Sequence, residues 1–241
     1  MQKIVIATTT CSKIFDTRAR LAIETVKSAK KYNYEIIVVD SDSCLELKEG
    51  LMREGAVFFE EERAGMGASR RQAMREASKF AGEQGVIVWM EPEKYPLIKE
   101  LGEASTQVIE GVADVAIFAR RSFDSYPEEQ AYTEQAANIM IGYLTGHNFD
   151  MFFGPKAFNQ KALQYFLEYK GDYGDRWDSI IIPGWRAFKA GLRVASVQVD
   201  YVHPQEQTTE ERGSTDFFKK RIEQLAVMVN AFEKETQAHE K

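Results

Sequence analysis

The feature that most constrains the fold is the alternation of short β-branched runs with helix-like patterns in the first half of the chain. Apolar runs of strand length occupy residues 4–8, 35–40, 56–59 and 86–90. Apolar residues recur at helical spacing between these runs, for example over residues 68–80. Alternating strands and helices are typical of right-handed βαβ units. The sequence therefore predicts an α/β fold whose mainly parallel central sheet is flanked by helices.

The second half of the chain continues this pattern. Apolar runs predict further strands at residues 113–118 and 194–202, with a short strand and turn at 150–154. Helical patterns cover residues 96–109 and about 128–145. No Pro/Gly-rich linker interrupts these elements, so we expect one large domain.

A last helix is predicted near the C-terminus, at about residues 215–236. Its apolar positions step by four, three, four and three residues: Phe218, Ile222, Leu225, Val229 and Phe232. This face can pack on its own domain or pair with a second copy, which leaves a homodimer open. We expect residues 1–209 to form the main domain and residues 210–241 to form this amphipathic helix and a tail.

Composition excludes several classes of protein. With 31 Lys+Arg against 37 Asp+Glu, the formal charge of −6 argues against a general nucleic-acid binder. No apolar stretch approaches the roughly 20 residues that span a bilayer. Cys11 and Cys44 are too few and too far apart for a disulfide framework. We therefore expect a cytoplasmic protein without a membrane span.

A glycine- and arginine-containing loop precedes the helix predicted at residues 68–80. Residues 63–71 read Arg-Ala-Gly-Met-Gly-Ala-Ser-Arg-Arg. Glycines let the backbone approach a ligand, and a helix N-terminus with nearby arginines favours phosphate. The alternative is a glycine turn with solvated arginines, and the loop matches neither a dinucleotide fingerprint nor a P-loop.

Several acidic or titratable residues follow the predicted strands. Glu91 and Glu93 end the fourth strand, where two carboxylates can face one divalent cation or simply be exposed. Asp178, beside Trp177, fits either a general base or a helix cap. His203 fits a metal ligand or a surface histidine. Because ligands of parallel sheets bind beyond the C-terminal strand ends, polar residues after the first, second and fourth strands are expected to share a cleft.

The order of these motifs resembles the family-2 glycosyltransferases with a GT-A fold, closest to the dolichol-phosphate-mannose-synthase-like branch. The likeness runs from residue 3 to about 204. It is carried by six segments in the family's order: residues 36–43, 65–77, 86–98, 111–121, 142–158 and 177–203. The resemblance implies a nucleotide-diphosphate sugar as donor and a divalent cation, Mg²⁺ or Mn²⁺, that neutralises the departing diphosphate.

The resemblance also implies roles for individual residues. The metal would be held by Glu91 and Glu93, with His203 as a third ligand. Asp178 would act as base on the acceptor hydroxyl, with Gly154 and Trp177 at the acceptor. The nucleoside and phosphates would be bound by the residues that match the family's donor site: Thr8, Asp40, Asp42, Gly67, Arg70 and Arg120.

This sequence departs from the family pattern at three places. The metal motif is Glu91-Pro-Glu93 where the family has Asp-x-Asp, and one carboxylate, Asp178, stands where an acidic pair is expected. The segment after His203 reads Pro-Gln-Glu-Gln-Thr-Thr instead of the cluster that binds lipid phosphate. These departures leave two readings open beside a transferase with an unidentified acceptor hydroxyl or phosphate. One is a catalytically altered nucleotide-sugar-binding protein, and the less favoured one is a sugar nucleotidyltransferase.

Overall fold

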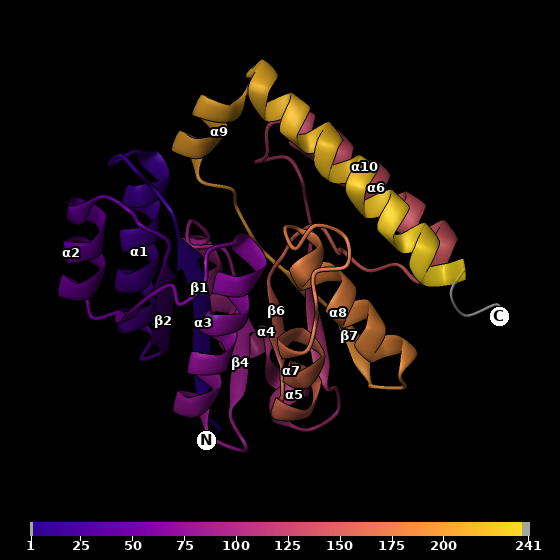
Figure 1. Ribbon diagram of the computed structural model, residues 1–241, viewed down its shortest axis with the longest axis horizontal. Helices are drawn as coiled ribbons and strands as arrows, with labels where there is room; N and C mark the ends of the chain where they lie inside the picture. The colour runs from indigo at the N-terminus through magenta and orange to yellow at the C-terminus, as the bar shows by residue number, and fades with distance from the viewer. Residues whose placement is uncertain (1, 238–241) are drawn as a thin grey trace.

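The computed structural model describes residues 2–237 and contains one seven-stranded sheet with helices on both faces (Figure 1). The strand order is β3-β2-β1-β4-β6-β5-β7. The strands are β1 (Ile4–Thr10), β2 (Glu35–Asp40), β3 (Val57–Glu60), β4 (Val86–Trp89), β5 (Val115–Arg120), β6 (Lys156–Phe158) and β7 (Val194–Val199). Only β6 runs antiparallel to its neighbours, so the predicted mainly parallel sheet is confirmed.

Of the short strand and turn predicted at residues 150–154, only the turn is present. Residues 151–153 form a turn, and the antiparallel strand β6 begins only at Lys156. The Asp150 carboxylate accepts hydrogen bonds from the backbone and guanidinium of Arg120, which fixes this segment beside the end of β5. The apolar run is therefore buried by packing rather than by strand pairing.

The helices follow the strands in the expected order. They are α1 (Thr17–Lys31), α2 (Leu45–Arg53), α3 (Met66–Ala81), the 3₁₀ helix η1 (Tyr95–Glu100), α4 (Leu101–Ala104), α5 (Thr106–Ile109), α6 (Glu128–Thr145), α7 (Gln160–Leu167), α8 (Asp178–Lys189), α9 (Gln205–Glu211) and α10 (Thr215–Gln237). The single helix predicted at 96–109 is instead divided into η1, α4 and α5. Its first turn opens on Pro96 in the tighter 3₁₀ geometry.

The sheet separates two hydrophobic cores, as strand alternation requires. Val5 and Ile37 belong to the core under α3, whereas Ile6 and Ile36 belong to the core under α1. All four are at most 2% exposed. This burial on both faces holds the C-terminal strand ends in fixed positions at one edge of the sheet.

Helix α10 packs along α6 and also contacts α8, so it covers the domain to which it belongs (Figure 1). Two residues of the predicted apolar face are in the core as expected, since Phe232 is fully buried and Leu225 packs against the same core. Phe218 and Ile222 are instead 44% and 45% exposed. The residues that turn inward are Phe217, Gln224, Met228, Ala231, Phe232 and Glu235. The buried face of α10 therefore differs in part from the predicted apolar face, because it includes polar as well as apolar side chains.

No helix within residues 2–237 is long and apolar enough to cross a membrane.

One buried carboxylate, Asp114, joins β5, α7 and the segment before β7. It accepts hydrogen bonds from the Arg193 backbone and guanidinium and from Asn159 Nδ2. The hydrogen bonds from Arg193 lower the pKa of Asp114 to about 2, although burial opposes the shift. Because the unfolded-state pKa is about 3.9, this stabilisation is fully present above that pH and is lost as the pH falls towards 2.

We therefore expect Asp114→Asn to lower the free energy of unfolding by about 1–2 kcal/mol near neutral pH, with a smaller loss in acid. Urea unfolding of wild type and variant at both pH values measures the difference. Asp216→Asn is the matched control, because the Asp216 side chain is 97% exposed. A loss that is the same at both pH values would contradict this assignment.

Candidate functional site

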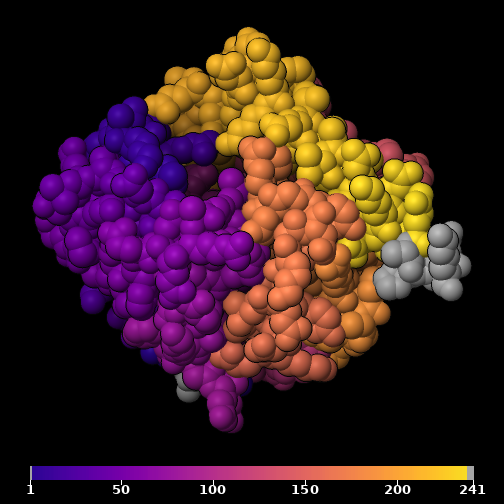
Figure 2. Space-filling view, viewed as in Figure 1, coloured from indigo at the N-terminus to yellow at the C-terminus, as the bar shows by residue number. Residues whose placement is uncertain are grey.

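A cleft of about 380 Å³ lies at the C-terminal ends of β1 and β4, with α9 and α10 beyond it (Figure 2). The space-filling view is hollowed between the N-terminal half and the C-terminal helices. Five of the predicted residues line the cleft: Arg70, Glu91, Glu93, Trp177 and His203. The other predicted residues do not line it: Thr8, Asp40, Asp42, Gly67, Arg120, Gly154 and Asp178.

The part of the cleft beside β1 and β2 is lined by backbone and small polar groups, including Ser12 and Ser41. Asp40 lies behind them, fully buried, and accepts hydrogen bonds from Thr10 Oγ1 at 2.6 Å and from the Ser43 amide at 2.9 Å. Asp42 is exposed and forms an ion pair with Lys13. The end of β2 and the turn after it, which carry Asp40 and Asp42, thus shape this end of the cleft.

Thr8 lies one residue before the lining part of β1 and is 1% exposed. Its Oγ1 is buried without a hydrogen-bond partner. Thr9 and Thr10, the next residues along the strand, reach the cleft instead.

The glycine loop meets the cleft at Gly65 and at the first residue of α3, Met66. Gly65 has φ +130°, a backbone conformation that side chains with a Cβ rarely adopt. Arg70, one turn into α3, donates to the Arg176 carbonyl at 2.6 Å and lies over the Trp89 ring. Its Nε is buried and has no hydrogen-bond partner. Arg70 as a whole lines the cleft, where a guanidinium can bind an anion.

Gly67 serves a different contact from the one predicted. A Cβ on Gly67 would lie 1.9 Å from Asp175 Oδ1, and the Gly67 amide donates to the Asp175 carbonyl. Arg71 forms a bidentate ion pair with the same carboxylate at 2.6 and 2.7 Å. Gly67 therefore lets the loop before α8 approach α3.

We expect Gly67→Ala to lower the free energy of unfolding by about 1–3 kcal/mol, because the new methyl group overlaps the Asp175 carboxylate. Chemical denaturation measures this loss. In the Asp175→Ala background the overlap is absent, so the same substitution should cost much less. Equal losses in both backgrounds would refute the close-approach explanation.

The two predicted metal-binding carboxylates both reach the cleft, in different surroundings. Glu91 Oε2 is buried without a hydrogen-bond partner. Its other oxygen, Oε1, lies close to Gly154. A Cβ atom added to Gly154 would be only 2.1 Å from it. Gly154 has φ +99°, and its carbonyl accepts from the fully buried Lys156 at 2.9 Å. Gly154 thus leaves the space that the Glu91 carboxylate occupies.

Glu93 lies among cations. Burial acts to raise the pKa of Glu93, but the charges of Arg18 and Lys94 outweigh it and lower that pKa. Lys94 is 7% exposed, lies 3.8 Å from Glu91, and sits over the Phe153 ring. Both carboxylates are therefore held next to positive charge in this structure.

His203 presents an unprotonated nitrogen. Its Nδ1 lies 2.8 Å from Thr208 Oγ1, whose single hydroxyl proton is donated to the Ser125 carbonyl. Thr208 must therefore accept from Nδ1–H, so Nε2 carries the lone pair. Burial and the charge of Lys94 lower the pKa of His203 to about 3. A neutral imidazole is the form that binds metal ions.

A divalent cation fits this donor set only in part. Within residues 2–237, no group of three His, Cys, Asp or Glu side chains is arranged to hold a metal ion. Mg²⁺ in phosphate-transfer sites is often bound by one or two carboxylates, with substrate phosphates and water completing its shell. The unpartnered oxygen of Glu91 and the neutral His203 are suited to such an incomplete shell.

Asp178 is fully buried at the first residue of α8, and its oxygens are already occupied. Oδ2 accepts from the Tyr169 hydroxyl at 2.6 Å, and Oδ1 accepts from the Arg176 amide at 2.7 Å. Asp178 is not the helix cap that the sequence offered as the alternative, because the N-cap position is Trp177 and no side chain caps α8. Instead, Asp178 accepts from the amides of Asp175 and Arg176 and holds the turn before the helix. Trp177, its neighbour, lines the cleft.

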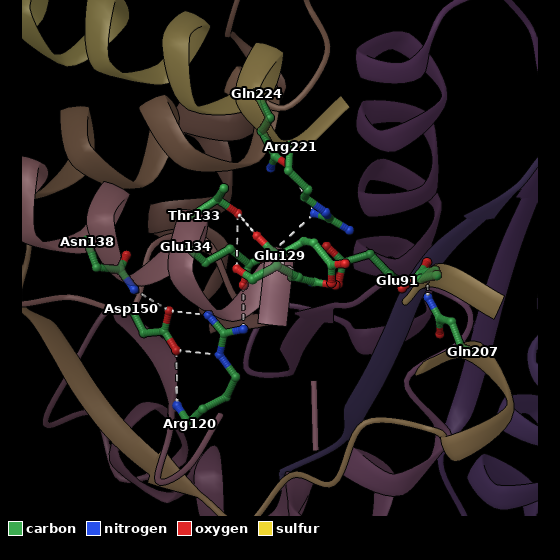
Figure 3. Close-up of polar contacts among 12 residues, drawn as sticks. Glu91, Arg120, Glu129, Thr133, Glu134, Asn138, Asp150, Gln207, Arg221 and Gln224 are labelled. Atoms are coloured by element: carbon green, nitrogen blue, oxygen red, sulfur yellow. Dashed lines mark hydrogen bonds and ion pairs between the residues drawn. The ribbon is translucent and has the colours of Figure 1, made fainter. Parts of the chain in front are cut away.

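Arg120, expected at the phosphates, lies in a buried ion network (Figure 3). Its side chain is 1% exposed and contacts Asp150 at 2.7 Å and Glu134 at 2.5 Å. Glu134 is also 3.3 Å from Arg221 of α10. The guanidinium of Arg120 is thus already paired, and the network links β5 to α6 and α10.

Residues that the sequence did not indicate complete the cleft. Arg18 of α1 and Lys94 line it, as do three residues of α10: Lys220, Arg221 and Gln224. The cations at positions 219–221 are visible in the sequence. Nothing in the helical pattern showed that they face the sheet edge, because this depends on how α10 packs against α6.

Comparison with known proteins gives similarity at the level of structure. No protein-family model and no curated protein matches the chain. Glucosyl-3-phosphoglycerate synthase from Mycobacterium tuberculosis, in complex with Mn²⁺, UDP-glucose and phosphoglyceric acid, superposes with a TM-score of 0.70. That match has 13% identity and covers 97% of this chain and 80% of that one. The chain has a GT-A fold.

Other complexes of the mycobacterial enzyme share this GT-A fold with the chain. The complex with Mn²⁺, UDP and glucosyl-3-phosphoglycerate has a TM-score of 0.67 at 14% identity, covering 96% of this chain and 80% of that one. The complex with Mn²⁺, UDP-glucose and glycerol 3-phosphate has a TM-score of 0.66 at 15% identity, with the same coverage. The GT-A fold predicted from motif order is therefore confirmed.

Proposed function

We propose that this protein is a glycosyltransferase that moves a sugar from a nucleotide-diphosphate sugar to an acceptor hydroxyl or phosphate. The observation that carries the proposal is the cleft, where Gly65, Arg70 and the unpartnered Glu91 oxygen meet at the C-terminal strand ends of a GT-A fold. The structurally similar enzyme is described with UDP-glucose and Mn²⁺. That description supports the same class of donor here.

The donor would lie along the cleft with its nucleoside beside Ser41 and its diphosphate near Arg70. Thr8, Asp40 and Asp42 would support the nucleoside end. A divalent cation would be bound at Glu91, Glu93 and His203 together with diphosphate oxygens, and it would neutralise charge on the leaving group. The incomplete protein shell makes cation and nucleotide binding mutually dependent.

The acceptor would bind beyond the diphosphate, beside Trp177 and the Gly154 segment. Asp178 remains our candidate base, and it would have to exchange its hydrogen bond from Tyr169 for one from the acceptor. A place in family 2 near the dolichol-phosphate-mannose-synthase-like branch, a homodimer, a cytoplasmic location and the division at residue 209 remain predictions. The last four residues of the range 210–241 lie outside the described residues.

A thermal-shift screen tests the proposal. UDP-, GDP-, ADP- and CDP-sugars are each added with and without Mn²⁺, and a bound donor should raise the melting temperature by mass action. We expect one nucleotide series to give a shift that requires the cation, and we expect Glu93→Ala to lose that cation-dependent shift. The absence of a cation-dependent shift with all four series would reject the proposal.

A second function is favoured by the occupied oxygens of Asp178 and the paired guanidinium of Arg120. Both side chains are paired with other residues of the protein instead of facing a substrate. This is expected of a nucleotide-sugar-binding protein whose catalytic residues have been altered. Release of nucleoside diphosphate from the bound donor distinguishes the two functions. Turnover that Asp178→Asn abolishes would exclude the binding-only function. Donor binding without turnover in the presence of both hydroxyl and phosphate acceptors would support it.

A further inference from the structure

Helix α10 brings two cations to the cleft from outside the segment that resembles glycosyltransferases. Lys220 and Arg221 lie on the second turn of this helix and line the cleft together with Arg18 of α1. Figure 3 shows Arg221 and Gln224 directed from α10 towards Glu134. The three cations, which we term the basic wall, come from elements about 200 residues apart in the chain.

Two members of the basic wall are partly neutralised. Arg18 contacts Glu211 at 2.5 Å, and Arg221 lies 3.3 Å from Glu134, which also pairs with Arg120. Arg221 Nε remains buried without a hydrogen-bond partner. Among the described residues Arg221 donates only through Nη1, to Glu134 and Gln224, so its Nε and Nη2 protons remain for a further anion.

Lys220 is the member whose charged group has no partner of its own in the described part of the chain. Within residues 2–237 its ammonium group makes no hydrogen bond or ion pair, although its side chain is only partly exposed. Burial and repulsion from Arg18 and Arg221 lower the pKa of Lys220 to about 8. All three cations line one cleft, where Glu93 and Glu211 offset their mutual repulsion only in part, so an oxyanion bound among them would be stabilised.

We propose that Arg18, Lys220 and Arg221 form a phosphate-binding subsite that closes the cleft from the side of α10. Its ligand is a phosphate group of a substrate, either the diphosphate of the nucleotide or an anionic group of the acceptor. This inference rests on the proposed function for the identity of the substrate. The binding of phosphate by these three cations does not depend on the proposed function.

Isothermal titration calorimetry of Lys220→Gln and Lys219→Gln tests the subsite. Lys219 is the matched control, since its side chain is 74% exposed and does not line the cleft. The probes are UDP, uridine, and inorganic phosphate with and without saturating UDP. A lost charge-assisted hydrogen bond is worth about 1.5–3 kcal/mol, so we expect the Kd of the phosphate-containing probe to rise roughly 10- to 100-fold.

The probes separate the two sources of phosphate. If the subsite binds the donor, Lys220→Gln weakens UDP but not uridine, and UDP displaces inorganic phosphate. If it binds the acceptor, UDP affinity is unchanged, and inorganic phosphate binds the UDP-saturated protein in a manner that requires Lys220. Lys220→Arg should retain binding in either case, and equal melting temperatures of the variants show that the fold is intact.

The outcomes also separate this inference from the proposed function. Unchanged affinity of Lys220→Gln for UDP and for inorganic phosphate, or an equal loss in Lys219→Gln, overturns the subsite while leaving a nucleotide-binding cleft. Lys220-dependent binding of inorganic phosphate by a protein that binds no nucleotide supports the subsite and rejects the donor.

Discussion

Replacing Arg120 by methionine is expected to lower the free energy of unfolding by about 3–5 kcal/mol. The substitution keeps an apolar stem but leaves Asp150 and Glu134 without their shared cation, and these side chains are only 9% and 3% exposed. An uncompensated charge in such a place is costly, because the protein cannot hydrate it as water does. Urea denaturation followed by circular dichroism measures the loss.

The neighbouring arginine gives the control. Arg121 pairs with Asp200 at the surface, where the two side chains are 58% and 67% exposed. Arg121→Met should therefore cost less than about 1 kcal/mol. Adding Glu134→Gln and Asp150→Asn to Arg120→Met should restore part of the lost stability. Similar losses for the two arginines would show that the buried network contributes no more than a surface pair.

Replacing Glu91 by glutamine is expected to lower kcat/KM for the donor by about 10²- to 10³-fold, with little change in stability. The amide matches the carboxylate in shape, so it fits against Gly154, but it removes the charge that faces the cleft. The rate of nucleoside diphosphate release, measured with the donor selected by the thermal-shift screen, reports the effect.

Glu103→Gln, at an exposed position on α4, removes the same charge far from the cleft and should leave the rate unchanged. A reduction of less than about threefold in Glu91→Gln would contradict a role for this carboxylate in stabilising the reacting groups.

The sheet could be predicted because each of its long strands carries a local signal. Residues 35–40 and 86–90, for example, are apolar runs of strand length, and both are buried in the structure. Strand β6 gave no such signal, because its three residues, Lys156–Phe158, include a buried lysine. Its place in the sheet depends on pairing with β4 and β5, which is a long-range contact.

The sequence predicted the location of two candidate site residues correctly, because they closely follow a strand. Glu91 and Glu93 follow β4 and reach the cleft as expected. The sequence could not show that Asp178 and Arg120 each have a partner inside the protein. These partners, Tyr169 for Asp178 and Glu134 for Arg120, come from other parts of the chain. Nor could it show the basic wall, because the inward face of α10 is set by its packing on α6 rather than by its apolar spacing.

These differences change the expected charge of the cleft. From the sequence, an acidic cleft was expected on which Glu91, Glu93, Asp40, Asp42 and Asp178 converge, and the two glutamates do line it. The three aspartates lie outside the lining. Four cations lie within it: Arg18, Lys94, Lys220 and Arg221. The cleft therefore offers cations of its own to an anionic donor, beside the two glutamates that would share a metal ion.

A crystal structure of the protein soaked with Mn²⁺ and the nucleotide sugar selected by the screen tests the central claim most directly. The account predicts electron density for the nucleotide along the cleft, with the nucleoside beside Ser41 and a metal ion between the diphosphate and Glu91 or Glu93. A cleft that stays empty, or a nucleotide bound elsewhere on the molecule, would contradict it.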